Sequence, residues 1–442
     1  MVTSTNFAVR PMSALTPRLD LHTGKPLWLE HTPAPLRRRR LRRDLTCDVA
    51  VVGAGITGAL VAHQLLAAGL RVVMLEKSDA GHGSTAASTG LLLYQPDSSI
   101  AEITRRHGRH AARRVYQLGR KAIQELGALA RELDPACGWN ARRTLYLASD
   151  QHHAAFLRAE EQRTRAIGFP VQRLSGRTLR KRYALEFPAA LFAPGSAQVH
   201  AFAFARAVLR DCLRDRRFQL FQQTRVRSIR ENQISVTLTT AEGRRVRARQ
   251  VVIAAGYESG RFVKSKLVQL HSTYAIASKP FPPAALEPLR CLMWETARPY
   301  FYLRTTADHR IVFGGEDEPF ANASRRDRKR KQKTRRLEAR LAALFPQLAF
   351  RAEYAWAGTF AETTDGLPCI GAATPGSRVL FALGYGGNGI TFSQIAARLL
   401  RDACTGKDNP DAALFAFDRL AKDPRSPARS EHAVRSQRSR GC

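Results

Sequence analysis

Residues 46–76 read TCDVAVVGAGITGALVAHQLLAAGLRVVMLE. The stretch opens with a short apolar run at 46–52, of the kind that forms a buried parallel strand. Apolar residues then recur at helical spacing over 56–68, and Gly69 supplies a stop signal for the helix. A second apolar run follows at 70–75. The stretch therefore predicts a β-α-β unit of about 30 residues with a right-handed crossover.

Three glycines, Gly53, Gly55 and Gly58, stand between the first strand and the helix. Gly53 permits the tight turn, Gly55 lets the backbone approach a pyrophosphate, and Gly58 allows helix and strand to pack closely. The helix N-terminus offers unpaired N–H groups and the positive end of its dipole to the phosphates. Glu76, at the end of the second strand, is placed to accept hydrogen bonds from an adenosine ribose. The unit predicts dinucleotide binding, and its acid disfavours NADP without separating NAD from FAD.

Two later glycine-rich segments are candidates for the rest of a dinucleotide site. Residues 81–90, GHGSTAASTG, follow the second strand and can lie against a second phosphate or a ribityl chain. Residues 384–389, GYGGNG, lead into the helical sequence ITFSQIAARLL. Glycines there let the backbone approach a flat ring, and the helix N-terminus can stabilise negative charge on the N1–C2=O edge of a reduced flavin. The pattern favours FAD, with a flexible turn and a glycine-rich cap as the structural alternatives.

Five segments occur in the order TCDVAVVGAGITGALVA, GHGSTAASTG, VVIAAG, WAGTFAETTDGLPCIG and GYGGNGITFSQIAARLL. In this the chain resembles the D-amino acid oxidase-like family of FAD-dependent oxidoreductases, which includes glycine, sarcosine and γ-glutamylputrescine oxidases. The resemblance covers about residues 46–420 in segments. It implies an α/β fold, with a Rossmann-like FAD-binding domain and a second α+β substrate domain built on an antiparallel sheet. It also implies cofactor contacts by Gly53, Gly55, Ile56, Thr57, Gly58, Glu76, Lys77, Ser84, Thr85, Gly90, Leu91, Val226, Ala255, Gly256, Gly386, Gly387, Asn388, Gly389 and Ile390.

The resemblance further implies the chemistry. A neutral small amine or amino acid lies over the flavin and loses its α-hydrogen as a hydride to N5, which gives an imine that water hydrolyses. Relatives that oxidise amino acids hold the substrate carboxylate with a Tyr and an Arg, and Arg does so through two parallel hydrogen bonds. In the predicted strand 299–304, alternation places Tyr300, Tyr302 and Arg304 on one face. Tyr302 and Arg304 are therefore the predicted substrate-binding pair at the catalytic centre, with an ordinary half-buried strand as the structural alternative.

Two positions depart from members of the family. Some relatives attach the flavin through a cysteine just after the strand that here reads WAGT at 356–359, and no Cys stands there, which predicts non-covalent FAD. Sarcosine-type oxidases place a Lys over the flavin to activate oxygen, and the matching strand at 310–315 has none. The electron acceptor, O₂ or another oxidant, is left open.

The order of the motifs predicts intertwined domains. Residues 1–45 are predicted to form an irregular arm, and residues 421–442 a disordered basic tail. The FAD-binding domain is predicted to be discontinuous, with segments 46–98, 186–260 and 361–420. The substrate domain is predicted to comprise 99–185 and 261–360.

The charge is unusual, because 71 Lys and Arg residues against 37 Asp and Glu residues give a formal net charge of +34. Two basic clusters lie at 37–43 and 325–336. Such a surplus can bind nucleic acid weakly and with strong salt sensitivity, although solvated helix faces can also carry it. No apolar run approaches the roughly 20 residues of a membrane span, and the N-terminus lacks a secretory core. Seven scattered cysteines without C-x-x-C spacing predict no metal site, and together these features favour a cytoplasmic protein.

Three alternatives to amine oxidation stay open at this point. The chain could be a 2-hydroxy acid or glycerol phosphate dehydrogenase on a similar scaffold. Its charge is compatible with an RNA-docking or tRNA-modifying flavoprotein. It could also be a catalytically silent binding module, although the retention of every cofactor motif argues against this.

Overall fold

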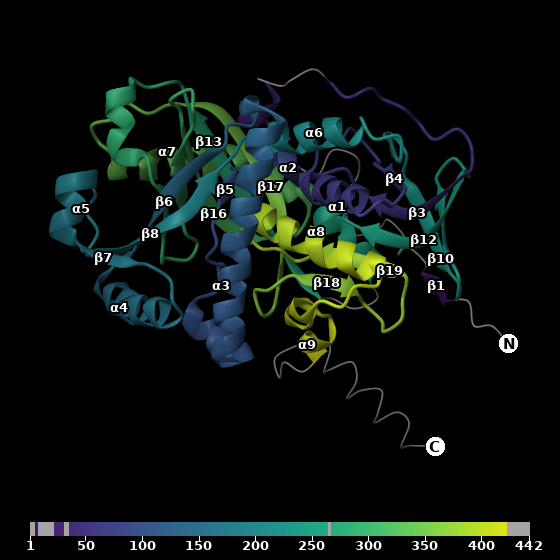
Figure 1. The fold of residues 1–442 in the computed structure, drawn as a ribbon. Helices are drawn as coiled ribbons and strands as arrows, with labels where there is room; N and C mark the ends of the chain where they lie inside the picture. The colour runs from purple at the N-terminus through teal and green to yellow at the C-terminus, as the bar shows by residue number, and fades with distance from the viewer. Residues whose placement is uncertain (1–4, 8–21, 31–34, 264–266, 422–442) are drawn as a thin grey trace, which may run out of the picture.

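A computed structural model describes residues 5–7, 22–30, 35–263 and 267–421. The described chain forms two large sheets, each covered by helices (Figure 1). The long helix α3 (Ile100–Leu133) runs down the middle of that view. This is the predicted class, an α/β fold with a Rossmann-like sheet and a second, mainly antiparallel sheet.

The first sheet, sheet A, contains the predicted β-α-β unit. Its strands are β1 Thr5–Phe7, β3 Leu45–Val52, β4 Val72–Leu75, β9 Phe218–Phe221, β10 Val226–Glu231, β11 Val236–Thr240, β12 Arg245–Ile253, β18 Cys369–Ala372 and β19 Val379–Leu383. The order is β1-β10-β11-β12-β3-β4-β9, with β19 beside β12 and β18 beside β19. The strands β19, β12, β3 and β4 lie side by side in that order, and each runs parallel to the next.

The register of the parallel strands brings their carboxyl ends to one edge. Val52 at the end of β3 lies opposite Leu75 of β4 on one side and Ile253 of β12 on the other. Ile253 in turn lies opposite Phe381 of β19. The segments that follow these strands therefore begin side by side, which is where an open α/β sheet binds its ligand.

Helices cover one face of sheet A and form the largest hydrophobic core. They are α1 Ile56–Ala67, α3, α6 Ala201–Cys212 and α8 Gly389–Thr405. Leu60 of α1, Leu209 of α6 and Ile395 of α8 are buried together in this core. Because α1 is apolar on nearly all sides, it is enclosed by neighbouring elements and not a surface helix.

The second sheet, sheet B, is antiparallel except for the pair β14 and β6. Its strands are β2 His22–Gly24, β5 Leu91–Leu92, β6 Asn140–Leu147, β7 Gln172–Ser175, β8 Ala189–Gln198, β13 Val268–Ser278, β14 Leu292–Glu295, β15 Tyr302–Thr305, β16 Ile311–Pro319 and β17 Ala352–Thr363. Their order is β2-β17-β13-β16-β15-β14-β6-β8-β5, with β7 beside β8. The remaining helical elements are α2 Ser84–Ala87, α4 Gln151–Ala166, α5 Gly176–Tyr183, α7 Ala323–Leu344, α9 Asp418–Ala421 and the 3₁₀ turns η1 Leu27–Leu29, η2 Pro135–Cys137, η3 Gly256–Phe262, η4 Pro283–Leu289 and η5 Pro410–Phe415.

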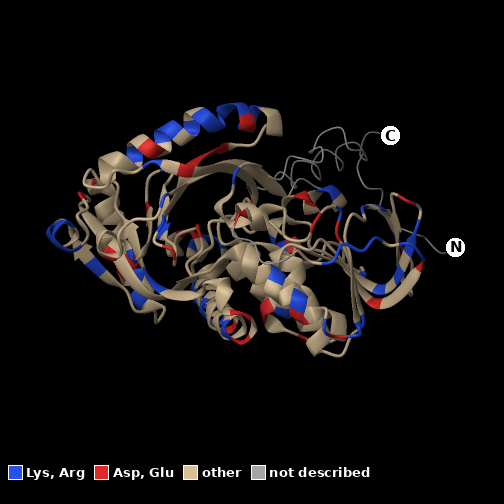
Figure 2. Cartoon of the chain, turned by 90° about the horizontal axis from the view of Figure 1, so that it is seen from above, with Lys and Arg blue, Asp and Glu red and all other residues tan. Residues whose placement is uncertain are grey.

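Helix α7 carries much of the predicted basic cluster at 325–336, and Figure 2 shows it as a largely blue helix along one side of the molecule. Its apolar side packs onto sheet B, where Leu337 and Leu341 join Phe313 in a buried core. Each of these leucines stabilises the packing by about 2 kcal/mol.

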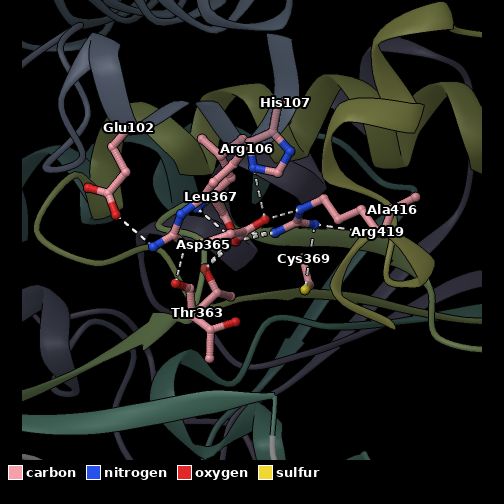
Figure 3. Close-up of polar contacts among 10 residues, drawn as sticks. Glu102, Arg106, His107, Thr363, Asp365, Leu367, Cys369, Ala416 and Arg419 are labelled. Carbon is pink, nitrogen blue, oxygen red and sulfur yellow. Dashed lines mark hydrogen bonds and ion pairs between the residues drawn. The ribbon is translucent and has the colours of Figure 1, made fainter. Parts of the chain in front are cut away.

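A buried polar cluster ties the end of β17 to two helices. Arg419 of α9 donates from Nε to Oδ2 of Asp365 at 2.8 Å and from Nη2 to the carbonyl of Leu367 (Figure 3). Nε2 of His107, on α3, lies 3.3 Å from the same carboxylate. Burial alone would raise the pKa of Asp365, but His107 and the charge of Arg419 lower it well below its usual value.

Some of the predicted domain segments hold strands of both sheets. Strand β8 lies in segment 186–260 but pairs with β6 in sheet B, and both ends of this strand are continuously buried. The arm 1–45 includes β2, which pairs with β17, and β1, which pairs with β10. The predicted tail at 421–442 lies outside the described residues apart from Ala421. The domain boundaries themselves stay a prediction.

Within the described part of the chain, no helix is long and apolar enough to cross a bilayer. In the same ranges, no group of three or more His, Cys, Asp or Glu side chains is placed to hold a metal ion.

Candidate active site

The three glycine-rich bends border one elongated cavity of about 900 Å³. The first bend contributes Gly53 and Gly55, the second Ser84 and Thr85, and the third Gly386 to Ile390. A cavity of this size lies at the upper end of the range for ligand pockets. Among the predicted cofactor-binding residues, those that line it are Gly53, Gly55, Ile56, Thr57, Glu76, Lys77, Ser84, Thr85, Leu91, Val226, Ala255, Gly256, Gly386, Gly387, Asn388, Gly389 and Ile390.

The turn from β3 into α1 requires its glycines. Gly53 has a φ of +106°, which L side chains rarely adopt. A Cβ on Gly58 would lie 1.9 Å from the carbonyl oxygen of Gly53, so Gly58 serves helix–strand packing and does not line the cavity. The backbone N–H of Ile56, at the start of α1, donates to Oγ1 of Thr85 at 3.0 Å. The first bend is thereby joined to the second.

The residues after β4 and β12 form the end of the cavity that adjoins sheet A. Glu76 accepts a hydrogen bond from the N–H of Ala54 at 2.8 Å, which holds its carboxylate beside the glycine turn. Lys77 forms an ion pair with Glu258 of η3. Gly256 faces open space, because the nearest atom to a Cβ there would be Oγ of Ser84 at 4.0 Å. A backbone that faces open space in this way can approach a phosphate closely.

Gly90, the last residue of the second bend, is a packing position. Its φ is +71°, and a Cβ would lie 2.2 Å from the carbonyl oxygen of Val199. It is absent from the cavity lining, unlike its neighbour Leu91. A glycine that packs against backbone and a glycine that faces a ligand look the same in the sequence, because both positions favour the same residue type.

The third bend places the N-terminus of α8 on the cavity. Gly386 donates its N–H to the carbonyl of Ala361 on β17 at 2.9 Å. The N–H of Gly387 donates to Oδ2 of Asp97 at 2.7 Å. A Cβ on Gly389 would meet nothing within 4 Å. The bend is thus held on both sides by hydrogen bonds while its backbone faces the open cavity.

A hydrogen bond joins the two helix N-termini at the cavity. The hydroxyl groups of Thr57 on α1 and Ser393 on α8 lie 2.7 Å apart, and both residues line the cavity. Each N-terminus offers unpaired N–H groups and a partial positive charge. One can stabilise a pyrophosphate and the other the negative charge of a reduced flavin ring. The cavity therefore fits FAD.

Tyr302 lies on the cavity wall, and Arg304 does not. The Tyr302 hydroxyl is 3.3 Å from Oγ1 of Thr273, and its ring covers Gly314. Two residues further along β15, Arg304 donates from Nη1 to the carbonyls of Gly90 at 2.9 Å and Val199 at 2.8 Å. The two side chains share a face of the strand, as alternation requires, but the cavity ends between them.

Arg304 is expected to act on stability and not on substrate binding. Burial lowers the pKa of Arg304 to about 9, and its guanidinium lies 5.1 Å from the centre of the Trp28 ring. Arg304→Met leaves two buried carbonyls without this donor, so we expect the free energy of unfolding to fall by about 2 kcal/mol. Denaturant unfolding measures that loss. If Arg304→Met instead raised the KM for the substrate and left the stability unchanged, Arg304 would be a substrate-binding residue.

The structure adds several cavity residues that the sequence patterns did not single out. Asp97 follows β5, and Asp317 lies near the end of β16. The other added residues on the sheet B side of the cavity are Thr273, Trp294, Thr359 and Phe360. Tyr300, which the alternation of strand 299–304 already places with Tyr302, also lines the cavity there. No local motif marks Asp97 or Asp317, because one lies in the loop after β5 and the other on β16, and only the folded chain brings both to the cavity. Among the residues that the structure shows lining the cavity, none is cysteine or histidine.

The cavity is bordered by glycine bends and two helix N-termini at the edge of a parallel sheet, and a mainly antiparallel sheet closes it. These features define a flavin-dependent oxidoreductase. Residues 48–403 match the family model of the FAD dependent oxidoreductases, DAO. The chain belongs to this family, and FAD is its cofactor.

Several known proteins are similar to this chain over most of their length. The glycine oxidase of Geobacillus kaustophilus is 28% identical, with 84% of this chain and 97% of the relative covered. The γ-glutamylputrescine oxidoreductase of Escherichia coli is 25% identical, with 88% and 89% covered. The crystal structure of the Geobacillus glycine oxidase superposes with a TM-score of 0.72 at 25% identity and covers 84% of this chain and 98% of that one. The prediction of an FAD-dependent enzyme of this family is confirmed.

Proposed function

We propose that the protein oxidises a small amine or amino acid, with Tyr302 on the wall of the substrate site. The observation that supports this is the end of the cavity next to Gly387. There Tyr300, Tyr302 and Trp294 form an aromatic wall that continues from the glycine bend. Such a wall excludes water from a C–H bond that is to be broken. The names of the relatives, glycine oxidase and γ-glutamylputrescine oxidoreductase, support the same substrate class.

Bound FAD supplies the acceptor for a hydride. The protein's own part is to bind a neutral amine, to orient its α-C–H bond and to keep water away. The C–H bond breaks with both electrons, the nitrogen lone pair forms the C=N bond, and an N–H proton leaves to give the imine. We propose that the predicted cofactor-binding residues on the cavity wall hold FAD without a covalent bond. The absence of cysteine and histidine from that described wall supports this.

Anaerobic substrate screening tests the proposal. The yellow enzyme is mixed with amines, amino acids, 2-hydroxy acids and glycerol phosphate, and loss of the oxidised flavin band near ~450 nm is recorded. We expect bleaching by an amine or amino acid. Bleaching by a hydroxy acid or glycerol phosphate alone would overturn the proposal. The rate at which O₂ restores the colour then decides whether O₂ or another oxidant is the acceptor.

Binding of a nucleic acid stays a prediction from charge. Several cations of α7 already pair with acidic side chains, including Lys329 with Glu318 and Lys333 with Glu316. The exposed Lys and Arg side chains of α7 that remain predict weak nucleic-acid binding dominated by phosphate contacts. We therefore expect affinity for tRNA to fall by about tenfold or more between about 50 and about 200 mM salt. An affinity that does not change over this range would exclude phosphate contacts as its source.

A further inference from the structure

The part of the cavity formed by sheet B has an acidic wall. Asp317, near the end of β16, and Asp97, after β5, both line it. Oδ2 of Asp97 accepts the N–H of Gly387 at 2.7 Å, which places this carboxylate at the glycine bend. A Cβ on Gly387 would lie 3.2 Å from the Tyr300 hydroxyl, so Tyr300 is beside them. The acidic side chains are thus next to the proposed reaction site.

One carboxylate oxygen of this wall lacks a hydrogen-bond partner among the residues that the structure describes. Oδ1 of Asp317 is buried and accepts no hydrogen bond from the described residues, while the Thr273 hydroxyl beside the carboxylate lowers its pKa. Burial raises the pKa of Asp317 to about 6, and the charge of Asp97 adds to the rise. A buried carboxylate oxygen without a donor is costly, which points to a donor supplied from outside the chain.

The cations on the cavity wall belong to the other end. They are Lys77, Arg225, Arg227 and Arg261, which lie after β4, at the start of β10 and on η3 after β12, all beside sheet A. Their position suits the phosphates of the cofactor and not the substrate. Within the described lining, the sheet B part therefore contains carboxylates without an Arg or Lys beside them.

The other charged groups near Asp97 and Asp317 do not place a positive charge inside the cavity. Arg298 is exposed and stacks on Tyr300, with its guanidinium 4.7 Å from the ring centre. Burial raises the pKa of both aspartates, and the charge of Arg298 opposes that rise without being part of the lining. Lys333 is bonded to Glu316 at 2.9 Å. Burial raises the pKa of Glu362 to about 7, and the charge of Asp97 adds to this rise, so Glu362 is partly protonated near neutral pH.

Aromatic rings complete the wall. Trp294 stacks on Tyr146 with ring centres 5.1 Å apart, and Tyr300 and Tyr302 have ring centres 6.0 Å apart. Aromatic faces attract cations, and carboxylates beside them strengthen that attraction. The combination is suited to an ammonium group and repels a carboxylate.

The reacting nitrogen cannot be the group that these carboxylates hold. Hydride loss needs its lone pair, and a carboxylate partner would favour the protonated, unreactive form. We infer that the substrate is a di- or polyamine, whose second, non-reacting ammonium group binds Asp317 and Asp97 between the aromatic rings. This inference rests on the proposed amine oxidation and narrows it to amines without a carboxylate at the bound end.

Three compounds with a four-carbon chain provide the test: 1,4-diaminobutane, 1-aminobutane and 4-aminobutanoate. Anaerobic flavin reduction at rising concentrations of each gives a Kd separately from the limiting rate. We expect the diamine to bind at least about tenfold more tightly than the monoamine, because a hydrogen bond to a charged group contributes to binding on this scale. The aminobutanoate is expected to bind most weakly.

The variants Asp317→Asn and Asp97→Asn are each expected to raise the Kd of the diamine by about 10-fold to 100-fold and to leave that of the monoamine almost unchanged. Both amides keep the size of the side chain, and the amide oxygen introduced by Asp97→Asn can still accept the Gly387 N–H. The control Glu186→Gln removes an exposed carboxylate outside the cavity and is expected to change neither Kd. FAD content and melting temperature confirm that each variant is folded.

The outcomes separate the two proposals. If no amine or amino acid reduces the flavin, the proposed function is wrong. If amines reduce it but the diamine has no advantage, or Asp317→Asn weakens both amines equally, the function stands and the diamine inference is wrong. Tight binding of 4-aminobutanoate that Arg298→Gln abolishes would assign the site to a carboxylate instead.

Discussion

Replacing Gly58 by valine is expected to give a protein that carries less than about a tenth of the wild-type FAD. Even the Cβ of alanine would lie 1.9 Å from the Gly53 carbonyl oxygen, and that oxygen belongs to backbone that cannot move aside. To relieve the contact, α1 must shift away from β3, which displaces the helix N-terminus from the cavity. The ratio of flavin to protein absorbance after purification measures the loss.

Two other glycine variants control this experiment. At Gly260, outside the cavity lining, an added Cβ would make only an ordinary contact with Val268 at 3.7 Å, so Gly260→Ala is expected to keep its flavin. At Gly55, the nearest atom would be the Thr85 hydroxyl at 3.2 Å. Gly55→Ala is therefore expected to fold and to bind FAD more weakly. Full FAD content in Gly58→Val would contradict the position given to this turn.

The parts of the site that the sequence predicted are those written in contiguous residues. The turn around Gly53, the loop at Ser84 and the bend at Gly386 each combine a strand or helix end with glycine or hydroxyl residues. Such local patterns can be recognised without knowledge of the fold, because a positive φ or a close backbone approach restricts the residue type wherever it occurs. The structure brings all three to one cavity.

The substrate end could not be predicted in the same way. Asp97 and Asp317 are 220 positions apart, and Asp97 reaches the cavity through the loop after β5, where its carboxylate accepts the Gly387 N–H. Alternation correctly placed Tyr302 and Arg304 on one face, but it could not show where along β15 the cavity ends. The edge strand β2 was also missed, since three residues of an edge carry too little periodicity to be recognised.

Breaking the buried pair between Arg419 and Asp365 is expected to cost about 3–5 kcal/mol of stability. The Asp365 side chain is 2% exposed and that of Arg419 is 9% exposed, so Arg419→Met leaves a carboxylate that water cannot solvate. The carboxylate follows directly after β17, whose residues 358–361 line the FAD cavity, and the loss is therefore expected to loosen cofactor binding as well. Urea unfolding of the holoenzyme, followed by circular dichroism and by flavin release, measures both effects.

An exposed ion pair and a pH series show whether the buried charge is the cause. Arg180 and Glu186 are 58% and 75% exposed, and Arg180→Met is expected to change stability by less than about 1 kcal/mol. Because the pKa of Asp365 is lowered in the folded protein, its contribution is complete above the unfolded value of about 4 and is lost as the pH falls further. The difference between wild type and Asp365→Asn should therefore stay constant from about pH 7 to about pH 5 and shrink below about pH 4. A difference that does not change with pH would mean that packing, and not the charge of Asp365, stabilises this junction of α3, α9 and the end of β17.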